Sequence, residues 1–132
     1  MQLQLVFVGK TALSPIDAAI DRYLERLVHF VPTRVHHVKA EKILPKAREA
    51  RIREKESDRI LDLVGKEGSL IVWDRRGRAL DSVGLAGFLQ QLVVRGGSKV
   101  WMVTGGPLGV SPRLLDAADS VLSLSRMTLP HD

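Results

Sequence analysis

Short apolar runs alternate along the chain with stretches in which apolar residues recur every three or four positions. The runs cover residues 2–8, 31–38, 69–73, 100–103 and 121–124, and their length and content of branched residues are typical of buried strands. The stretches between them have the spacing of amphipathic helices. Because strands that alternate with helices form a parallel sheet covered on both faces, we expect an α/β fold. The prediction is a single domain, 1–132, built as a three-layer sandwich with a mostly parallel five-stranded sheet.

The first two helices are predicted from their start and stop signals. The first begins at Ser14-Pro15 and ends before Pro32; its apolar stripe consists of Ile16, Ala19, Ile20, Tyr23, Leu24 and Leu27. The second begins within the charged stretch 39–59 and ends at Gly65, which serves as its C-cap. Its apolar positions, which we expect on the core, are Ile52, Ile60, Leu61 and Val64.

Two further helices are predicted in the second half of the chain. Ser82 is the expected N-cap of the third helix, which ends at Gly96-Gly97. Its residues expected to be buried are Val83, Ala86, Leu89, Leu92 and Val93. Ser111 followed by Pro112 is typical of an N-cap with proline at the first helical position, and it predicts a short fourth helix that reaches Ala118.

The last two predicted strands both end in loops that are candidates for a ligand-binding site. Strand 100–103 runs into the glycine-rich turn 105–109, and strand 121–124 runs into the loop 125–130. Loops at the carboxyl ends of neighbouring parallel strands form the crevice in which open α/β sheets bind ligands. The turn matches neither the P-loop nor the dinucleotide motif, and taken alone it is more often a tight turn. The apolar side chains and backbone groups of 124–129, in contrast, suit a flat ring such as adenine.

The amino-acid composition narrows the classes of protein to which the chain could belong. The 132 residues are 45% hydrophobic and 27% charged, as in ordinary globular proteins, and no apolar run approaches the roughly 20 residues that cross a bilayer. The absence of cysteine excludes disulfides, thiolate zinc sites and a cysteine nucleophile. No signal-peptide pattern opens the chain, so we expect a cytoplasmic protein without membrane contact. The net charge of +5 favours a polyanionic partner, although this signal is modest.

Two charged features allow alternative interpretations. The stretch 39–59 mixes both signs, which is typical of a solvated helix with pairs four residues apart; the alternative is a basic loop that contacts phosphates. His36 and His37 are adjacent in a predicted strand and therefore point to opposite faces. We expect them to be ordinary strand residues and expect no metal site.

Groups with catalytic chemistry are few. The serines 120, 123 and 125 have no general base near them in the sequence, and no nucleophile elbow is present. The carboxylates are scattered, at Asp74, Asp81, Asp116 and Asp119. His131 is the one titratable group beside the predicted crevice and is therefore the candidate catalytic residue. A frayed terminal histidine is the simpler interpretation.

Several motifs together resemble a known family. The C-terminal part reads Thr-Gly-Gly-Pro-Leu-Gly over 104–109 and Leu-Ser-Leu-Ser-Arg-Met-Thr-Leu-Pro-His over 122–131. The opening strand with Gly9-Lys10, and the Asp74-x-x-Gly77 turn, match as well. With these motifs the chain resembles, along essentially its whole length, the RlmH family of SPOUT-class methyltransferases.

The resemblance implies a fold, an activity and partners. Members of the family have an α/β trefoil knot and are small, basic, cytoplasmic homodimers. They methylate N3 of a pseudouridine in large-subunit ribosomal RNA with S-adenosylmethionine, and no metal is implied. We therefore expect ribosomal RNA in the ribosome as the partner, together with a second copy of the chain.

Matching positions carry the family's cofactor contacts onto this sequence. They are Trp73, Gly105, Leu124, Ser125, Arg126, Met127, Thr128 and Leu129. Trp73 departs from the aliphatic residue usual at its position, and it either stacks on the cofactor or crowds it. Removal of the N3 proton is expected from His131 or from a basic residue of a second copy.

The family continues past the Pro-His pair into a further helix, which packs in the dimer interface and supplies groups on the RNA side. The sequence ends at Asp132, so we expect an incomplete knot and a weakened dimer interface in residues 1–132. Two other functions stay open. One is a non-catalytic RNA- or ribosome-binding protein that keeps the fold, and the other is a nucleotide-binding α/β enzyme of another kind.

Overall fold

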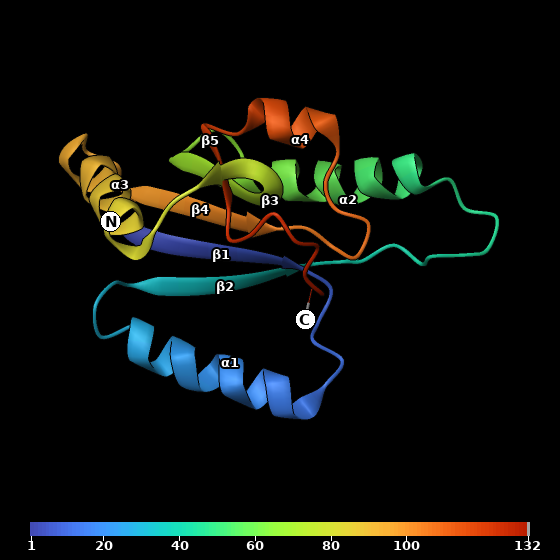
Figure 1. Ribbon diagram of the computed structural model, residues 1–132, viewed down its shortest axis with the longest axis horizontal. Coiled ribbons are helices and arrows are strands. Elements are labelled where there is room, and N and C mark those ends of the chain that lie inside the picture. Colours follow the sequence, from blue (N-terminus) through green and yellow to red (C-terminus); the bar gives the residue numbers. More distant parts are fainter. Residues whose placement is uncertain (132) are drawn as a thin grey trace.

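The computed structural model describes residues 1–131, in which strands and helices alternate in the predicted order (Figure 1). The elements are β1 (Gln2–Val8), α1 (Ser14–Leu27), β2 (Thr33–Val38), α2 (Glu49–Val64), β3 (Ser69–Ala79), α3 (Ser82–Val94), β4 (Lys99–Thr104), α4 (Pro112–Ala117) and β5 (Ser120–Ser123). Within residues 1–131, no helix is both long and apolar enough to cross a membrane.

The strands form a single twisted sheet in the order β2-β1-β4-β3-β5. Each of its pairings is parallel, which confirms the predicted α/β fold and sheet. Because the strands run in one direction, their carboxyl ends meet at one edge. Trp73 at this edge pairs with Thr104 of β4 and with Leu122 of β5, so β3 lies between the two strands that lead into the predicted crevice.

Helices cover both faces of the sheet. On one face α2 and α4 pack their residues Ile60, Val64 and Leu114 on the sheet. On the other face α1 and α3 contribute partly buried residues, among them Leu27 and Phe88. Figure 1 shows α2 and α4 above the sheet and α1 below it. The three predicted layers are therefore present.

The capping signals of α2 and α4 are confirmed. Gly65 ends α2 with φ of 63°, a conformation that glycine adopts without strain. Ser111 caps α4, because its Oγ accepts a hydrogen bond from the N–H of Leu114 at 3.3 Å. Ile52 and Ile60 are buried as expected, and Leu61 packs against the core while partly buried.

The predictions for α3 are wrong in two respects. Its N-cap is Asp81, whose Oδ1 accepts a hydrogen bond from the N–H of Gly84 at 2.6 Å, and Ser82 is the first helical residue. No residue of α3 is buried, and Val83 is 81% exposed. Of the residues expected inside, Leu89 and Leu92 are half-buried, whereas Val83, Ala86 and Val93 are exposed. The helix is apolar on most of its circumference, so apolar spacing does not single out the face that meets the sheet.

Several strand boundaries also differ from the prediction, by one residue at each end of β4 and at the start of β5 and more clearly in three places. β2 begins at Thr33, two residues after the expected start. β3 continues to Ala79, because its chain pairs again with β5 after a register shift between Trp73 and Arg78. β5 ends at Ser123 and leaves Leu124 outside the strand. The last two differences both lie at the carboxyl edge, where irregular backbone borders the candidate site.

Candidate functional site

A cavity of about 590 Å³ opens at the carboxyl edge of the sheet. Its walls include the glycine-rich turn 105–109, the end of β3 at 73–76 and the C-terminal loop. The prediction that the two loops after β4 and β5 meet at one edge is thus confirmed. The volume lies within the range of about 300–1,000 Å³ that is usual for small-molecule sites.

Three glycines shape the turn after β4. Gly109 has a φ of 79°, and its N–H donates a hydrogen bond to the carbonyl of Gly106 at 2.9 Å. A Cβ on Gly105 would come within 2.7 Å of Val110 Cγ1. A Cβ on Gly106 would come within 3.0 Å of Glu56 Oε2. The turn therefore packs closely on its surroundings because it has no side chains at these positions.

Helix α2 packs against this turn and against the residues that follow it. Glu56 is only 3% exposed, and its Oε2 has no hydrogen-bond partner within the described part of the chain. Burial raises the pKa of the Glu56 carboxyl, against the opposing effect of Arg59. The next residue, Ser57, accepts a hydrogen bond at 2.9 Å from the N–H of Ser111, two residues after the turn. Two neighbouring residues of α2 thus contact both ends of the segment that forms this wall.

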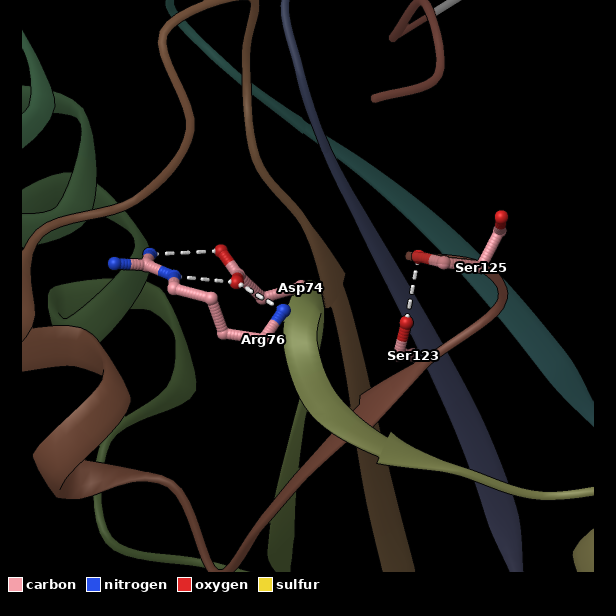
Figure 2. Close-up of polar contacts among 4 residues, drawn as sticks. All are labelled: Asp74, Arg76, Ser123 and Ser125. Atoms are coloured by element: carbon pink, nitrogen blue, oxygen red, sulfur yellow. Dashed lines mark hydrogen bonds and ion pairs between the residues drawn. The ribbon is translucent and has the colours of Figure 1, made fainter. Parts of the chain in front are cut away.

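The loop after β5 is held by serine hydrogen bonds. Ser123 Oγ donates to the carbonyl of Ser125 at 2.8 Å (Figure 2), and Ser125 Oγ accepts from the N–H of Met127 at 3.0 Å. The loop leaves large apolar side chains in the open, with Leu124 75% and Met127 70% exposed. Exposed apolar groups beside backbone polar groups are suited to hold a flat heterocycle such as adenine.

The third wall is formed by residues that follow Trp73. Asp74 and Arg76 form an ion pair in which Nε donates to Oδ1 at 2.7 Å and Nη2 donates to Oδ2 at 2.9 Å (Figure 2). The hydrogen bond from Arg76 holds the pKa of the Asp74 carboxyl below its ordinary value, and the same bond raises the pKa of Arg76. Both groups therefore stay ionised around neutral pH.

Most of the residues expected to bind the cofactor line this cavity. They are Trp73, Gly105, Leu124, Ser125, Met127, Thr128 and Leu129, and His131 joins them. Arg126 belongs to the same loop but is not among the residues that line the cavity. The structure brings these residues together, and their roles stay predictions.

Four charged residues at the cavity were not predicted. They are Arg53, Asp74, Arg75 and Arg76. His131 is consequently not the one titratable group beside the crevice. Arg53 comes from α2, far away in the sequence, so no local pattern points to it. The run Asp-Arg-Arg-Gly at the end of a strand is a signal that was available in the sequence.

The two adjacent histidines of β2 lie outside this cavity. His36 Nε2 lies 2.7 Å from Gln4 Oε1, and its ring contacts Trp101. Burial lowers the pKa of His36. His37 Nδ1 lies 2.7 Å from the carbonyl oxygen of Gly9. Within residues 1–131 no group of three or more histidine, cysteine or acidic side chains is placed to hold a metal ion.

Comparisons with known proteins agree with one another. A family model described as "Predicted SPOUT methyltransferase" matches residues 1–132. A protein of Syntrophobacter fumaroxidans named "Ribosomal RNA large subunit methyltransferase H" is 53% identical, over 100% of this chain and 85% of its own length. Proteins of the same name from Halothermothrix orenii and Citrifermentans bemidjiense are 38% and 35% identical, each over 99% of this chain and over 84% and 83% of their own lengths.

Proposed function

Because the chain belongs to the SPOUT methyltransferase family, we propose that it transfers a methyl group from S-adenosylmethionine to N3 of a pseudouridine in large-subunit ribosomal RNA. The names of its relatives support ribosomal RNA as the substrate. The excess of basic residues, with a net charge of +5, supports a polyanionic partner. We further propose that the protein acts in the cytoplasm as a homodimer.

The observation that carries this proposal is the cavity between the glycine-rich turn and the apolar loop. The residues present fit a nucleoside. The exposed side chains of Leu124 and Met127 offer apolar packing to a ring, and Gly105, Gly106 and Gly109 of the turn offer backbone groups without side chains of their own. In this proposal Trp73, Gly105 and the loop 124–129 hold the adenosine.

Bound S-adenosylmethionine supplies an electrophilic methyl group on a sulfonium. The task of the chain is then to align the target nitrogen, to take up its proton and to exclude water. Alignment alone is worth up to about 7–11 kcal/mol in favourable cases. Arg53, which also pairs with Glu49, and Arg75 line the cavity and are placed to hold RNA phosphates. His131, which also lines the cavity, or a basic residue of the second copy takes the proton from N3.

The direct test is methyl transfer to ribosomes. Large ribosomal subunits that lack the modification are incubated with the protein and S-adenosylmethionine carrying a labelled methyl group. We expect label in the large-subunit RNA and a new stop of reverse transcriptase at one pseudouridine, because N3 lies on the pairing edge of the base.

Calorimetry with S-adenosylmethionine, ATP and NAD separates the alternatives. Binding of S-adenosylmethionine and of ribosomes without transfer of label indicates a non-catalytic binding protein. Binding of ATP or NAD, with no heat from S-adenosylmethionine, indicates a nucleotide-binding enzyme of another class. Either result refutes the proposed reaction.

A further inference from the structure

The ion pair between Asp74 and Arg76 lies in the wall of the cavity. It is bidentate, and a third hydrogen bond of 2.9 Å joins the backbone N–H of Arg76 to Oδ1 of Asp74. The Asp74 side chain is only 10% exposed, whereas that of Arg76 is 57% exposed. The carboxylate is thus anchored, and the guanidinium extends from it at the cavity surface.

The backbone around the pair explains why it is held in place. Asp74 and Arg76 lie in the register shift of β3, between Trp73 and Arg78, where ladder pairing with β5 is interrupted. Pairing resumes next to Gly77, which lies so close to β5 that a Cβ would approach the Leu122 carbonyl carbon to 2.6 Å. The irregular segment is therefore fixed at both ends, and its ion pair is preorganised.

The pair still has capacity for a ligand. Nη1 of Arg76 donates no hydrogen bond within the described residues, and Nε and Nη2 are taken by Asp74. A carboxylate oxygen has two lone-pair sites, so Oδ2 of Asp74, which accepts from Nη2, keeps one acceptor position. One wall of the cavity therefore offers a cationic donor and an anionic acceptor next to each other.

A cationic donor beside an anionic acceptor favours a zwitterionic ligand over a phosphate. A phosphate that approached Arg76 would also meet the negative charge of Asp74, which offsets the attraction. Arg75 is next in sequence, lines the same cavity and forms no ion pair within residues 1–131, so it is the better partner for a phosphate. An α-amino acid group, with a carboxylate beside an ammonium, matches the two charges of the pair.

We propose that the Asp74–Arg76 pair is the subsite for the amino-acid end of the methyl donor, with Arg76 donating to its carboxylate and Asp74 accepting from its ammonium. This inference rests on the proposed use of S-adenosylmethionine. The cavity then has two subsites, a charged one at the ion pair for the amino-acid end and an apolar one at the loop 124–129 for the adenine. Figure 2 shows the side chains of Asp74 and Arg76 extending away from Ser125, as two separate subsites require.

The test compares two ligands that differ in the amino-acid end. S-adenosylhomocysteine carries this end, and 5′-methylthioadenosine keeps the adenosine and the sulfur without it. Their affinities are measured by calorimetry for the unaltered protein and for Arg76→Gln, Arg76→Lys, Asp74→Asn and, as the matched control, Arg75→Gln. Thermal unfolding of each variant confirms that it is folded.

We expect Arg76→Gln to weaken S-adenosylhomocysteine about tenfold or more, the effect of losing one charge-assisted hydrogen bond, and to leave 5′-methylthioadenosine unchanged. Asp74→Asn should show the same selectivity, Arg76→Lys should restore part of the affinity, and Arg75→Gln should change neither ligand. A loss shared equally by both ligands, or no loss for either, overturns the inference.

Two further results have clear meanings. If Arg76→Gln weakens only the binding of ribosomes, the guanidinium contacts phosphate, and the assignment to the amino-acid end is wrong. If the unaltered protein binds neither nucleoside, the proposed function fails together with the inference. Binding of both ligands without selectivity in the variants leaves the proposed function standing and removes the inference alone.

Discussion

Glu56 is the residue in which burial and charge conflict most clearly. It lies beneath the glycine-rich turn, 3% exposed, with one carboxylate oxygen unpartnered among the described residues. Its burial raises the pKa, and the nearby Glu41 acts in the same direction while Arg59 opposes both. A group whose pKa is raised in the folded state stabilises the fold most when it is protonated. Its contribution is fully present below the unfolded-state pKa and is lost as the pH rises through the folded-state pKa.

Glu56→Gln should therefore be more stable than the unaltered protein at neutral pH. The substitution removes the charge that burial penalises, and we expect a gain on the order of 1–2 kcal/mol that shrinks as the pH falls through the folded-state pKa of Glu56. Urea unfolding at several pH values measures it. Glu54→Gln, on the exposed side of the same helix, is the control and should change stability little at any pH. A gain for Glu56→Gln that is independent of pH contradicts the assignment of the cost to the charge.

Gly77 is required for a different reason, the close approach of two backbones. A Cβ at this position would lie 2.7 Å from the Leu122 nitrogen and 2.7 Å from the Val121 carbonyl carbon, atoms that cannot move without breaking the β3–β5 pairing. Gly77→Ala should therefore cost about 3 kcal/mol, the upper end for an overpacked site. Denaturant unfolding measures the cost. Gly87→Ala is the control, because its Cβ meets nothing within 4 Å in helix α3, and it should stabilise by roughly 0.5–1 kcal/mol. Equal effects of the two substitutions would show that the close contact does not exist.

At the scale of elements, the junction of α2 and α4 holds the glycine-rich turn. The N–H of Ser111 donates to Ser57 Oγ, and both residues are buried. Ser57→Ala leaves this N–H without a partner, which should cost about 1–3 kcal/mol. Because Ser111 lies only two residues after the turn, we also expect weaker binding of S-adenosylhomocysteine in calorimetry.

Asp81→Ala provides the comparison for this prediction. It removes the cap of α3, outside the cavity, and should cost about 1 kcal/mol. The affinity for the nucleoside should stay unchanged. If both variants lose affinity in proportion to their lost stability, the α2–α4 junction has no special role in holding the turn.

Elements with a clear boundary or a clear polar face were predictable from the sequence, and the others were not. α2 has mostly charged residues outside and Ile52 and Ile60 inside, with Gly65 at its end, so the apolar part of its buried face and its end were found. The burial of Glu56 on the same face was not predicted, because it depends on contact with the turn after β4. α3 lacks such contrast, and its inward face was assigned wrongly. The register shift in β3 was missed because it depends on where Gly77 meets β5, a contact between distant segments.

At the scale of the whole molecule, the candidate site follows from topology. Parallel strands place the ends of β3, β4 and β5 at one edge, so the meeting of the turn 105–109 with the loop 124–129 was predictable. Arg53 lines the cavity because of the way in which α2 packs on the sheet, and the spacing of residues in the sequence does not reveal that packing. The run Asp-Arg-Arg-Gly placed Asp74 and Arg76 near this edge, but their pairing depends on the irregular backbone of β3, which the sequence does not reveal.

The distribution of charge around the cavity gives a prediction for binding to the ribosome. Arg75 is exposed at the cavity without an ion pair in the described chain, so it is free to neutralise a phosphate. Each phosphate contact contributes about 0.7 to 0.9 to the slope of log affinity against log salt concentration. Arg75→Gln should therefore weaken binding to large ribosomal subunits and reduce this slope by about that amount.

Arg22→Gln and Arg76→Gln test the location and the kind of contact in the same salt series. Arg22 is exposed on α1, away from the cavity, and the charge of Arg76 is offset by Asp74, so neither substitution should change the slope. An equal reduction for Arg22→Gln would mean that RNA is held over the whole basic surface. Because the slope counts the phosphates contacted and is insensitive to base recognition, a reduction confined to Arg75→Gln would place the RNA backbone at the mouth of the cavity.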